Sequence, residues 1–391
     1  MTPSRPVPPT RAAALLVLNA LEGWGPVSGR KALQWAGDDY RRLFDATEAE
    51  LAALVGVPRA QALRAWPRHI DLAREEDGLA ALGARFVPCD DPAYPRRLRM
   101  LEDAPLGLYW RGREGVPEEA MAVVGTRHMT AYGRKVTERF TRELVTAGFA
   151  IVSGLALGVD ACAHVAALRG GGHTLAVLGN GLDVVYPSAN RSLFTEMATK
   201  GALVSEFPLG RRPDRQTFPQ RNRLVSGMTV GTLVVETARR GGSLITARFA
   251  MEQNRTVFAV PGRLDQPHSG GCLELIRDGA TLVTSVDEML EELRFMQLDL
   301  GLSTAAERAA TKTGAPAGFS LAGLGEDEQS VVRVLPPGEA WHLDQLCEAT
   351  DLPGHRVQAA LMMLELQRLV VRTGGGTYER GFDQVLSPEA S

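Results

Sequence analysis

The hydrophobic pattern of the first 78 residues is that of several short helices. Residues 1–10 are proline-rich, and we expect them to form a flexible tail. Between Arg11 and about Ile70, apolar residues recur every three or four positions in segments broken by turns, as on one face of a helix. These segments are AAALLVLNALEGW, SGRKALQWA, DDYRRLFD, ATEAELAALVGV and RAQALRAW. The pattern predicts a small all-α domain over residues 11–78.

One turn in this block, within LVGVPRAQAL, joins an apolar helix end to a new helix through a glycine and a proline. The arrangement resembles a helix-hairpin-helix, in which backbone N–H groups can hold DNA phosphates. A plain turn between two packed helices has the same pattern, and we favour that structural interpretation.

The pattern changes after about residue 79, where short β-branched runs alternate with amphipathic segments such as YGRKVTERFTRELVTAG. The seven candidate strands are AMAVVGT, FAIVSG, HTLAVLG, ALVSEF, GTLVVET, TVFAVPG and TLVTS. This alternation predicts an α/β domain over residues 79–298, with an extended Rossmann-like, doubly wound parallel sheet. Ligands of such sheets bind beyond the carboxyl ends of the strands. The polar residues that follow each strand are therefore the first candidates for a binding site.

The C-terminal part has a third pattern. Residues 299–322 are rich in Ala, Gly, Ser and Thr without periodicity, which predicts a linker. The segments EDEQSVVRVL, LDQLCEATD and RVQAALMMLELQRL predict three helices, and LVVRTGGGTYERG predicts two strands joined by glycines. Three helices followed by a β-hairpin predict a winged-helix domain over residues 323–384.

The composition is that of an ordinary soluble protein, with 45% hydrophobic and 23% charged residues among 391. The formal net charge is −3, so a nucleic-acid site would depend on a local cluster of positive charge. The four cysteines include no CxxC pair and indicate neither a zinc site nor a disulfide framework. The start, MTPSRPVPPTR, lacks a signal-peptide core, and the apolar run Ala12–Leu18 is too short to cross a bilayer. We therefore expect a cytoplasmic protein without metal or cofactor.

The first candidate site motif follows the apolar run MAVV, where Gly125, Thr126 and Arg127 stand at a predicted strand end. A glycine there permits a sharp turn that brings backbone N–H groups towards an anion. The guanidinium of Arg127 can bind a phosphate through two N–H groups. A surface turn with a solvated arginine is the alternative.

The second motif is SGLALGVD, in which Ser153 and Gly154 end a predicted strand before a glycine-rich loop. The loop can approach a phosphate closely, but it lacks the Gly-Lys-Ser/Thr of a P-loop, and Ser153 lacks the GxSxG of a nucleophile elbow. Asp160 and His164 lie one helical turn apart and could form an acid–base pair. We favour a helix-start carboxylate packed against a partly buried histidine.

The strongest candidate is the segment RRPDRQTFPQRNR, residues 211–223. It holds five arginines and one aspartate, a net +4 in a chain whose total is −3. Phe218 stands in its middle, and arginines around an aromatic ring suit the phosphates and bases of a single strand. A solvated basic loop is the alternative. The apolar continuation LVSGM favours a packed helix that starts at Arg221 to Arg223, with these side chains at its anion-favouring N-terminus.

A further glycine turn, Gly241-Gly242-Ser243, comes after Glu236 and a pair of arginines, Arg239-Arg240. It opens a predicted helix whose first turn contains Thr246. This turn is a candidate anion-binding loop, and a simple capped helix start is the alternative.

Taken together, these motifs resemble those of the DNA-processing protein A family, also called DprA or Smf. The matching elements stand in order over roughly residues 92–290: YPRRLRMLEDAPLGLYWRG, VVGTR with a following YG, SGLALGVDACAH, GNGLDVVYP, SEFPLG, FPQRNRLVSG and GGSLITARFAMEQNRTVFAVPG. Seven motifs in one order are highly specific. One departure is Gly241, where the family's SGS turn has serine.

The resemblance implies a protein that is not an enzyme. It implies a homodimer that binds and protects single-stranded DNA and loads a RecA-type recombinase in natural transformation and recombination. It also implies a sterile-alpha-like N-terminal domain and a C-terminal winged helix. The positions that it implies for DNA binding are Gly125, Thr126, Arg127, Gly154, Arg215, Phe218, Gln220, Arg221, Asn222, Arg223, Gly242, Ser243 and Thr246.

Two other functions stay open from the sequence. A Rossmann-type nucleotide phosphoribohydrolase also uses glycine-rich loops and a GT…E strand, here Gly231, Thr232 and Glu236. Against it, SGMTV replaces the PGG that precedes GT in those enzymes, and an arginine-rich loop has no place in such a pocket. A winged-helix transcription regulator needs base-reading side chains, and HRVQAALMMLELQRL carries few.

Overall fold

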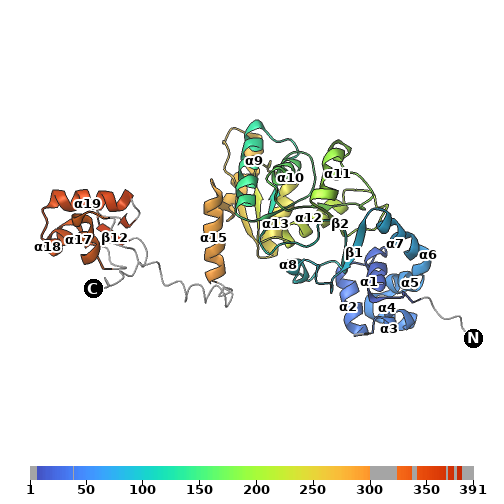
Figure 1. Ribbon diagram of the computed structural model, residues 1–391. Helices are drawn as coiled ribbons and strands as arrows, with labels where there is room; N and C mark the ends of the chain where they lie inside the picture. Colours follow the sequence, from blue (N-terminus) through green and yellow to red (C-terminus); the bar gives the residue numbers. More distant parts are fainter. Residues whose placement is uncertain are drawn as a thin grey trace, which may run out of the picture. The chain divides into compact units, whose positions relative to one another are not determined.

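The computed structural model describes residues 7–37, 39–299, 324–336, 341–366, 369–373 and 377–380. They belong to two compact units, residues 1–296 and residues 297–391 (Figure 1). Most of the predicted tail at 1–10 and nearly all of the predicted linker at 299–322 lie outside the described residues. Within the described residues, no helix is long and apolar enough to cross a membrane.

The first unit begins with the predicted block of short helices. They are α1 (Arg11–Ala20), α2 (Pro26–Ala36), α3 (Arg41–Asp45), α4 (Glu48–Val55), α5 (Val57–Arg64), α6 (Trp66–His69) and α7 (Leu72–Ala81). Helix α4 begins with a capping box, in which the Thr47 hydroxyl accepts from the Glu50 N–H and the Glu50 carboxylate accepts from the Thr47 N–H. Gly56, at φ 88°, separates α4 from α5 as a turn between packed helices. This geometry fits the structural interpretation of LVGVPRAQAL.

A nine-stranded sheet forms the centre of this unit, in the order β1-β2-β6-β5-β4-β3-β7-β8-β9. The seven predicted strands are β3 (Ala120–Val124), β4 (Ala150–Ser153), β5 (Thr174–Leu178), β6 (Ala202–Ser205), β7 (Gly231–Val234), β8 (Thr256–Ala259) and β9 (Thr281–Leu282). All neighbours among these seven pair in parallel. The Rossmann-like α/β prediction is therefore confirmed.

Two further strands were not predicted, and they make the sheet mixed. Strands β1 (Ala84–Pro88) and β2 (Gly107–Gly112) pair antiparallel, and β2 continues antiparallel onto β6. Leu106, just before β2, packs in the core of the helical block. Leu16 and Leu79 of that block pack in one cluster with Tyr109 of β2. Because α7 runs across residue 78 and the two parts share apolar clusters, the boundary at 78 stays a prediction.

The helices cover the two faces of the sheet as the alternation of side chains along β3 requires. Met121 and Val123 face α9 (Ala131–Thr146), α10 (Val159–Arg169) and α15 (Val286–Asp299). Ala122 and Val124 face α12 (Thr217–Gly227), α13 (Ser243–Glu252) and α14 (Gly270–Arg277). The remaining helices of this part are α8 (Arg96–Arg99), α11 (Arg191–Lys200) and the 3-10 turns η1 (Ser188–Asn190) and η2 (Pro267–Ser269).

Strand order fixes where a ligand can enter. Strand β3 lies between β4 and β7, so the chain builds β4, β5 and β6 on one side of β3 and β7, β8 and β9 on the other. This reversal opens a crevice beyond the carboxyl ends of β3, β4 and β7, which is where open α/β sheets bind their ligands.

The second unit contains α17 (Glu326–Val334), α18 (Leu343–Thr350) and α19 (Gly354–Leu366), with β10 (Trp341–His342), β11 (Val370–Thr373) and β12 (Thr377–Arg380). The strands form an antiparallel sheet in the order β10-β12-β11. Val331, Leu346 and Leu361 are buried in its core. These elements agree with the predicted winged helix, to which β10 adds a short strand. The predicted glycine turn at 374–376 lies outside the described residues.

Candidate nucleic-acid interface

A cavity of about 550 Å³ lies in the crevice at the switch point of the sheet. Eleven of the thirteen predicted DNA-binding positions line it, and two, Gln220 and Arg223, do not. The eleven are Gly125, Thr126, Arg127, Gly154, Arg215, Phe218, Arg221, Asn222, Gly242, Ser243 and Thr246. The structure thus brings four separate sequence motifs to one place.

The cavity also has lining residues outside the thirteen predicted positions. They are Val124, His128, Ala156, Asp160, Pro219, Val225, Thr237, Ala238, Gly241, Ile245 and His268. Thr237 and Ala238 follow β7 closely, so the rule that ligands bind at strand ends could have found them. His268 stands in η2, after β8, and no local pattern marks it.

Helix α12 starts earlier than the sequence analysis predicts. It begins at Thr217, four residues before Arg221, and its N-terminus holds the Asp214 carboxylate. One oxygen of Asp214 accepts from the N–H groups of Gln216 and Thr217, at 2.7 and 2.9 Å. The prediction that Arg221 stands at the helix start is therefore wrong, and this N-terminus already has an anion of its own.

Arg221 instead reaches across the crevice as a buried cation, only 5% exposed. Its Nη1 donates to the carbonyl oxygens of Gly154, just after β4, and Val177, near the end of β5. A Cβ at position 154 would stand 2.2 Å from that Nη1, so only glycine permits this approach. Arg221 therefore ties α12 to two strand ends.

Asp160 holds the same loop from the other side. Its Oδ2 accepts from the N–H groups of Gly154 and Ala156, at 3.1 and 3.4 Å. Burial raises the pKa of this carboxyl, and the charge of Arg221 opposes that rise. Buried opposite charges with several hydrogen bonds each keep a loop in one conformation, which prepares the Gly154 turn for a ligand.

His164 does not act with Asp160. Its Nδ1 lies 2.7 Å from the Thr174 hydroxyl oxygen, and that hydroxyl donates to the Ile151 carbonyl. Burial, with a contribution from Arg221, lowers the pKa of His164 to about 3. The histidine is thus a neutral, fully buried core residue, and its hydrogen bond goes to Thr174 rather than to Asp160.

Two exposed cations and one ring form the rim of the cavity. Arg127 and Arg215 are exposed, and Phe218 is half-buried. The guanidinium carbon of Arg127 lies 5.5 Å from the centroid of the Phe218 ring, within the range of a cation–π contact. Arg211, in the same loop, bonds Asp214 at 2.6 Å. The rim thus offers planar charged groups beside an aromatic surface.

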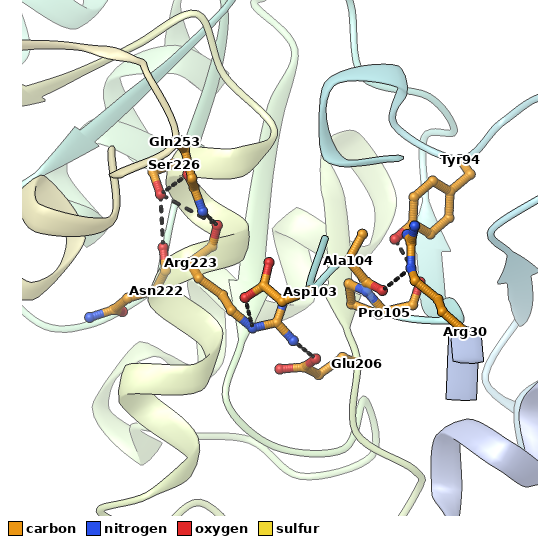
Figure 2. A network of polar contacts seen from close by, with 10 residues as sticks. All are labelled: Arg30, Tyr94, Asp103, Ala104, Pro105, Glu206, Asn222, Arg223, Ser226 and Gln253. Carbon is orange, nitrogen blue, oxygen red and sulfur yellow. Dashed lines mark hydrogen bonds and ion pairs between the residues drawn. The ribbon is translucent and has the colours of Figure 1, made fainter. Parts of the chain in front are cut away.

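Arg223 does not line the cavity, and its side chain reaches Asp103 and Glu206 instead (Figure 2). It is 7% exposed, its Nη2 pairs with Glu206, and its Nε lies 3.4 Å from Asp103. Positions 221 and 223 are separated by about 200° around a helix, so they cannot serve one face. The structure does not place Arg223 at the site, because the helix began earlier than predicted.

The first and fourth motifs are connected through the end of β7. The Glu236 carboxylate accepts from the Thr130 N–H and hydroxyl at 2.9 and 2.6 Å, while its carbonyl accepts from the Thr126 N–H at 2.6 Å. Glu236 therefore fixes the Gly125–Arg127 turn. A Cβ at Gly241 would stand 2.1 Å from Oγ1 of Thr237, so a larger residue at this position would displace the Thr237 side chain.

Comparisons with known proteins find family matches in both units of the chain. The family described as "DNA recombination-mediator protein A" matches residues 85–294, and the "DprA winged helix domain" matches residues 315–376. The chain belongs to the DNA recombination-mediator protein A family. The family match confirms the predicted resemblance, and the winged-helix match confirms the predicted fold of the second unit.

Relatives of this family match most of the chain. Protein Smf of Escherichia coli is 36% identical over 87% of this chain and 91% of its own length. Protein Smf of Synechocystis is 37% identical over 76% of this chain and 80% of its own. The X-ray structure of DNA processing protein A from Streptococcus pneumoniae superposes with a TM-score of 0.62 at 34% identity, covering 71% of this chain and 95% of that one.

Proposed function

We propose that this protein binds single-stranded DNA in the crevice and delivers it to a RecA-type recombinase in natural transformation and recombination. The observation that carries the proposal is the arrangement at the rim, where Arg127 and Arg215 stand beside the half-buried Phe218. Guanidinium groups suit phosphates, and a ring with an accessible face suits a base.

The cavity favours an unpaired strand over a duplex. Phe218 is half-buried at the wall of a cavity of about 550 Å³, so a base must leave the stack to reach it. In a duplex the bases are stacked and paired, and extruding one costs a few kcal/mol. A single strand binds without this free-energy cost, because no base pair has to break.

Backbone groups add to the charge at the rim. Helix α13 begins at Ser243 with its N-terminus towards the cavity, and Gly242, Ser243 and Thr246 line the wall there. The positive end of a helix dipole favours a phosphate. In contrast to α12, whose first turn binds Asp214, α13 has no acidic residue in its first turn. A phosphate beside Arg127 and α13 would therefore meet positive charge from two elements.

We propose no catalytic role for this site. The carboxylates nearest the cavity are engaged, Asp160 with Arg221 and two N–H groups, and Glu236 with Thr130. His164 is buried and bonded to Thr174. These contacts support binding over hydrolysis of a nucleotide, and incubation with nucleoside monophosphates should release no free base. The homodimer, the recombinase partner and the cytoplasmic location complete the proposal on the strength of family membership.

A gel-shift comparison of one labelled oligonucleotide, alone and annealed to its complement, tests the proposal. We expect retarded single strand at protein concentrations that leave the duplex unshifted. Equal retardation of both would contradict the argument from the half-buried ring. Retardation of neither would remove nucleic-acid binding from the function.

A further inference from the structure

A second, smaller hollow adjoins the main cavity and shares part of its lining. Its walls include Arg127, Gly154, Ala156, Phe218 and Arg221, which also border the first. The residues that belong to it alone are Leu157, Leu178, Gly179, Asn180, Tyr186 and Pro187. They come from the ends of β4 and β5 and from the loop before η1.

The chemistry of this hollow is mostly apolar. Tyr186 and Leu157 are 39% and 38% exposed, and Pro187 and Phe218 complete the apolar walls. The hollow has a volume of about 50 Å³, too small to enclose a base. A flat group must therefore lie on its exposed surface, and the ring of Tyr186 is the largest such surface there.

Tyr186 and Phe218 form an aromatic pair. Their ring centroids are 5.5 Å apart, and the rings are tilted by 33°. A Cβ at Gly179 would stand 3.2 Å from Cδ1 of Phe218, so the backbone after β5 supports this ring closely. The pair is therefore held at the edge of the sheet, with Arg127 beside it at 5.5 Å from the Phe218 centroid.

We propose that Tyr186 is a second stacking platform, which binds the base of the nucleotide next to the one on Phe218. This inference rests on the proposed single-strand function and adds a subsite to it. A base inserted between two rings needs about twice the 3.4 Å stacking distance, which is more than the 5.5 Å between these centroids, so no base fits between the rings. Two neighbouring nucleotides thus each use one ring, with their shared phosphate within reach of Arg127.

Replacement of Tyr186 by leucine tests the subsite, because leucine keeps apolar area and removes the ring. Base–aromatic stacking predicts that Tyr186→Leu weakens oligo-dT binding between about 5-fold and about 100-fold. The slope of log affinity against log salt should stay that of wild type, because no phosphate contact is lost. Tyr186→Phe should bind as wild type. Tyr132→Leu is the matched control, since Tyr132 is 51% exposed and borders neither hollow.

A single abasic site moved along the oligonucleotide separates the subsite from an indirect effect on Phe218. Wild type should show two adjacent sensitive positions, and Tyr186→Leu should lose one and keep the other. Loss of the Phe218 position instead would mean that Tyr186 only positions that ring, and wild-type affinity of Tyr186→Leu would also overturn the inference. If wild type binds no oligo-dT, the proposed function itself fails, whereas weakening by Phe218→Leu alone leaves that function in place.

Discussion

The charge of the rim can be tested by removing two arginines that the fold does not need. Arg127 and Arg215 are exposed cations at the cavity wall, so replacing both by alanine should leave the fold intact. If each binds one phosphate of a single strand, each contributes about 0.7 to the slope of log affinity against log salt. The double variant should therefore have a slope smaller by about 1.4.

This slope has a direct consequence for affinity. Between about 50 mM and about 200 mM salt, wild type should lose about 7-fold more affinity than the double variant. Fluorescence anisotropy of a short labelled oligo-dT, titrated at several salt concentrations, measures this difference. Arg221 is unsuitable for the test, because alanine there would leave the buried Asp160 without its cation.

The matched control removes two other exposed arginines, Arg142 on α9 and Arg169 on α10. Helices that follow parallel strands run back from the carboxyl edge of the sheet, so both residues lie towards the edge opposite the cavity. The control loses the same net charge and should keep the wild-type slope. A wild-type slope in Arg127→Ala/Arg215→Ala, or an equal fall in the control, would refute phosphate contact at the rim.

Three further predictions follow from the buried groups and the ring. Phe218→Ala should cost about 1–3 kcal/mol of oligo-dT binding in the same titration if a base stacks on it, and wild-type affinity would exclude stacking. Arg223→Ala should lower the free energy of unfolding, measured by urea denaturation, by about 3–5 kcal/mol, since Glu206 stays buried without its partner. The slope of log affinity against log salt should stay that of wild type, and a changed slope would show that Arg223 contacts a phosphate. Burial lowers the pKa of His164 to about 3 and of His173 to about 4, so the unfolded chain binds protons first as the pH falls below about 6.5. The free energy of unfolding should therefore fall between that pH and about pH 3, by at most about 1.4 kcal/mol per pH unit for each histidine. In His164→Gln this fall should be smaller. A fall as steep as that of wild type would contradict the assignment of His164 as a neutral buried residue.

The sequence alone was sufficient to predict the strands that are buried on both faces of the sheet. Runs such as MAVV and LAVL are continuous and apolar, so β3 to β8 could be predicted, and the rule for strand ends then placed most of the site. Strands β1 and β2 were missed because β1 is only partly buried and their antiparallel pairing brings together segments about 20 residues apart. The local pattern of hydrophobic residues carries no information on which distant segments pair.

The roles of the two arginines in RNR depended on where α12 begins. A shift of four residues places both inside the helix, so Arg221 points to the strand ends and Arg223 to Glu206. Their partners, Asp160 and Glu206, come from other parts of the chain, and composition alone made all five arginines of the segment equivalent. Burial, which separates structural from DNA-binding arginines, is a tertiary property.

The central claim is that an unpaired strand occupies the crevice at the carboxyl ends of β3, β4 and β7. A crystal structure of the full chain with oligo-dT tests it most directly. The account predicts phosphates beside Arg127 and the start of α13, with one base on Phe218. A strand bound elsewhere with the crevice empty, or a lone mononucleotide there with a broken glycosidic bond, would contradict it.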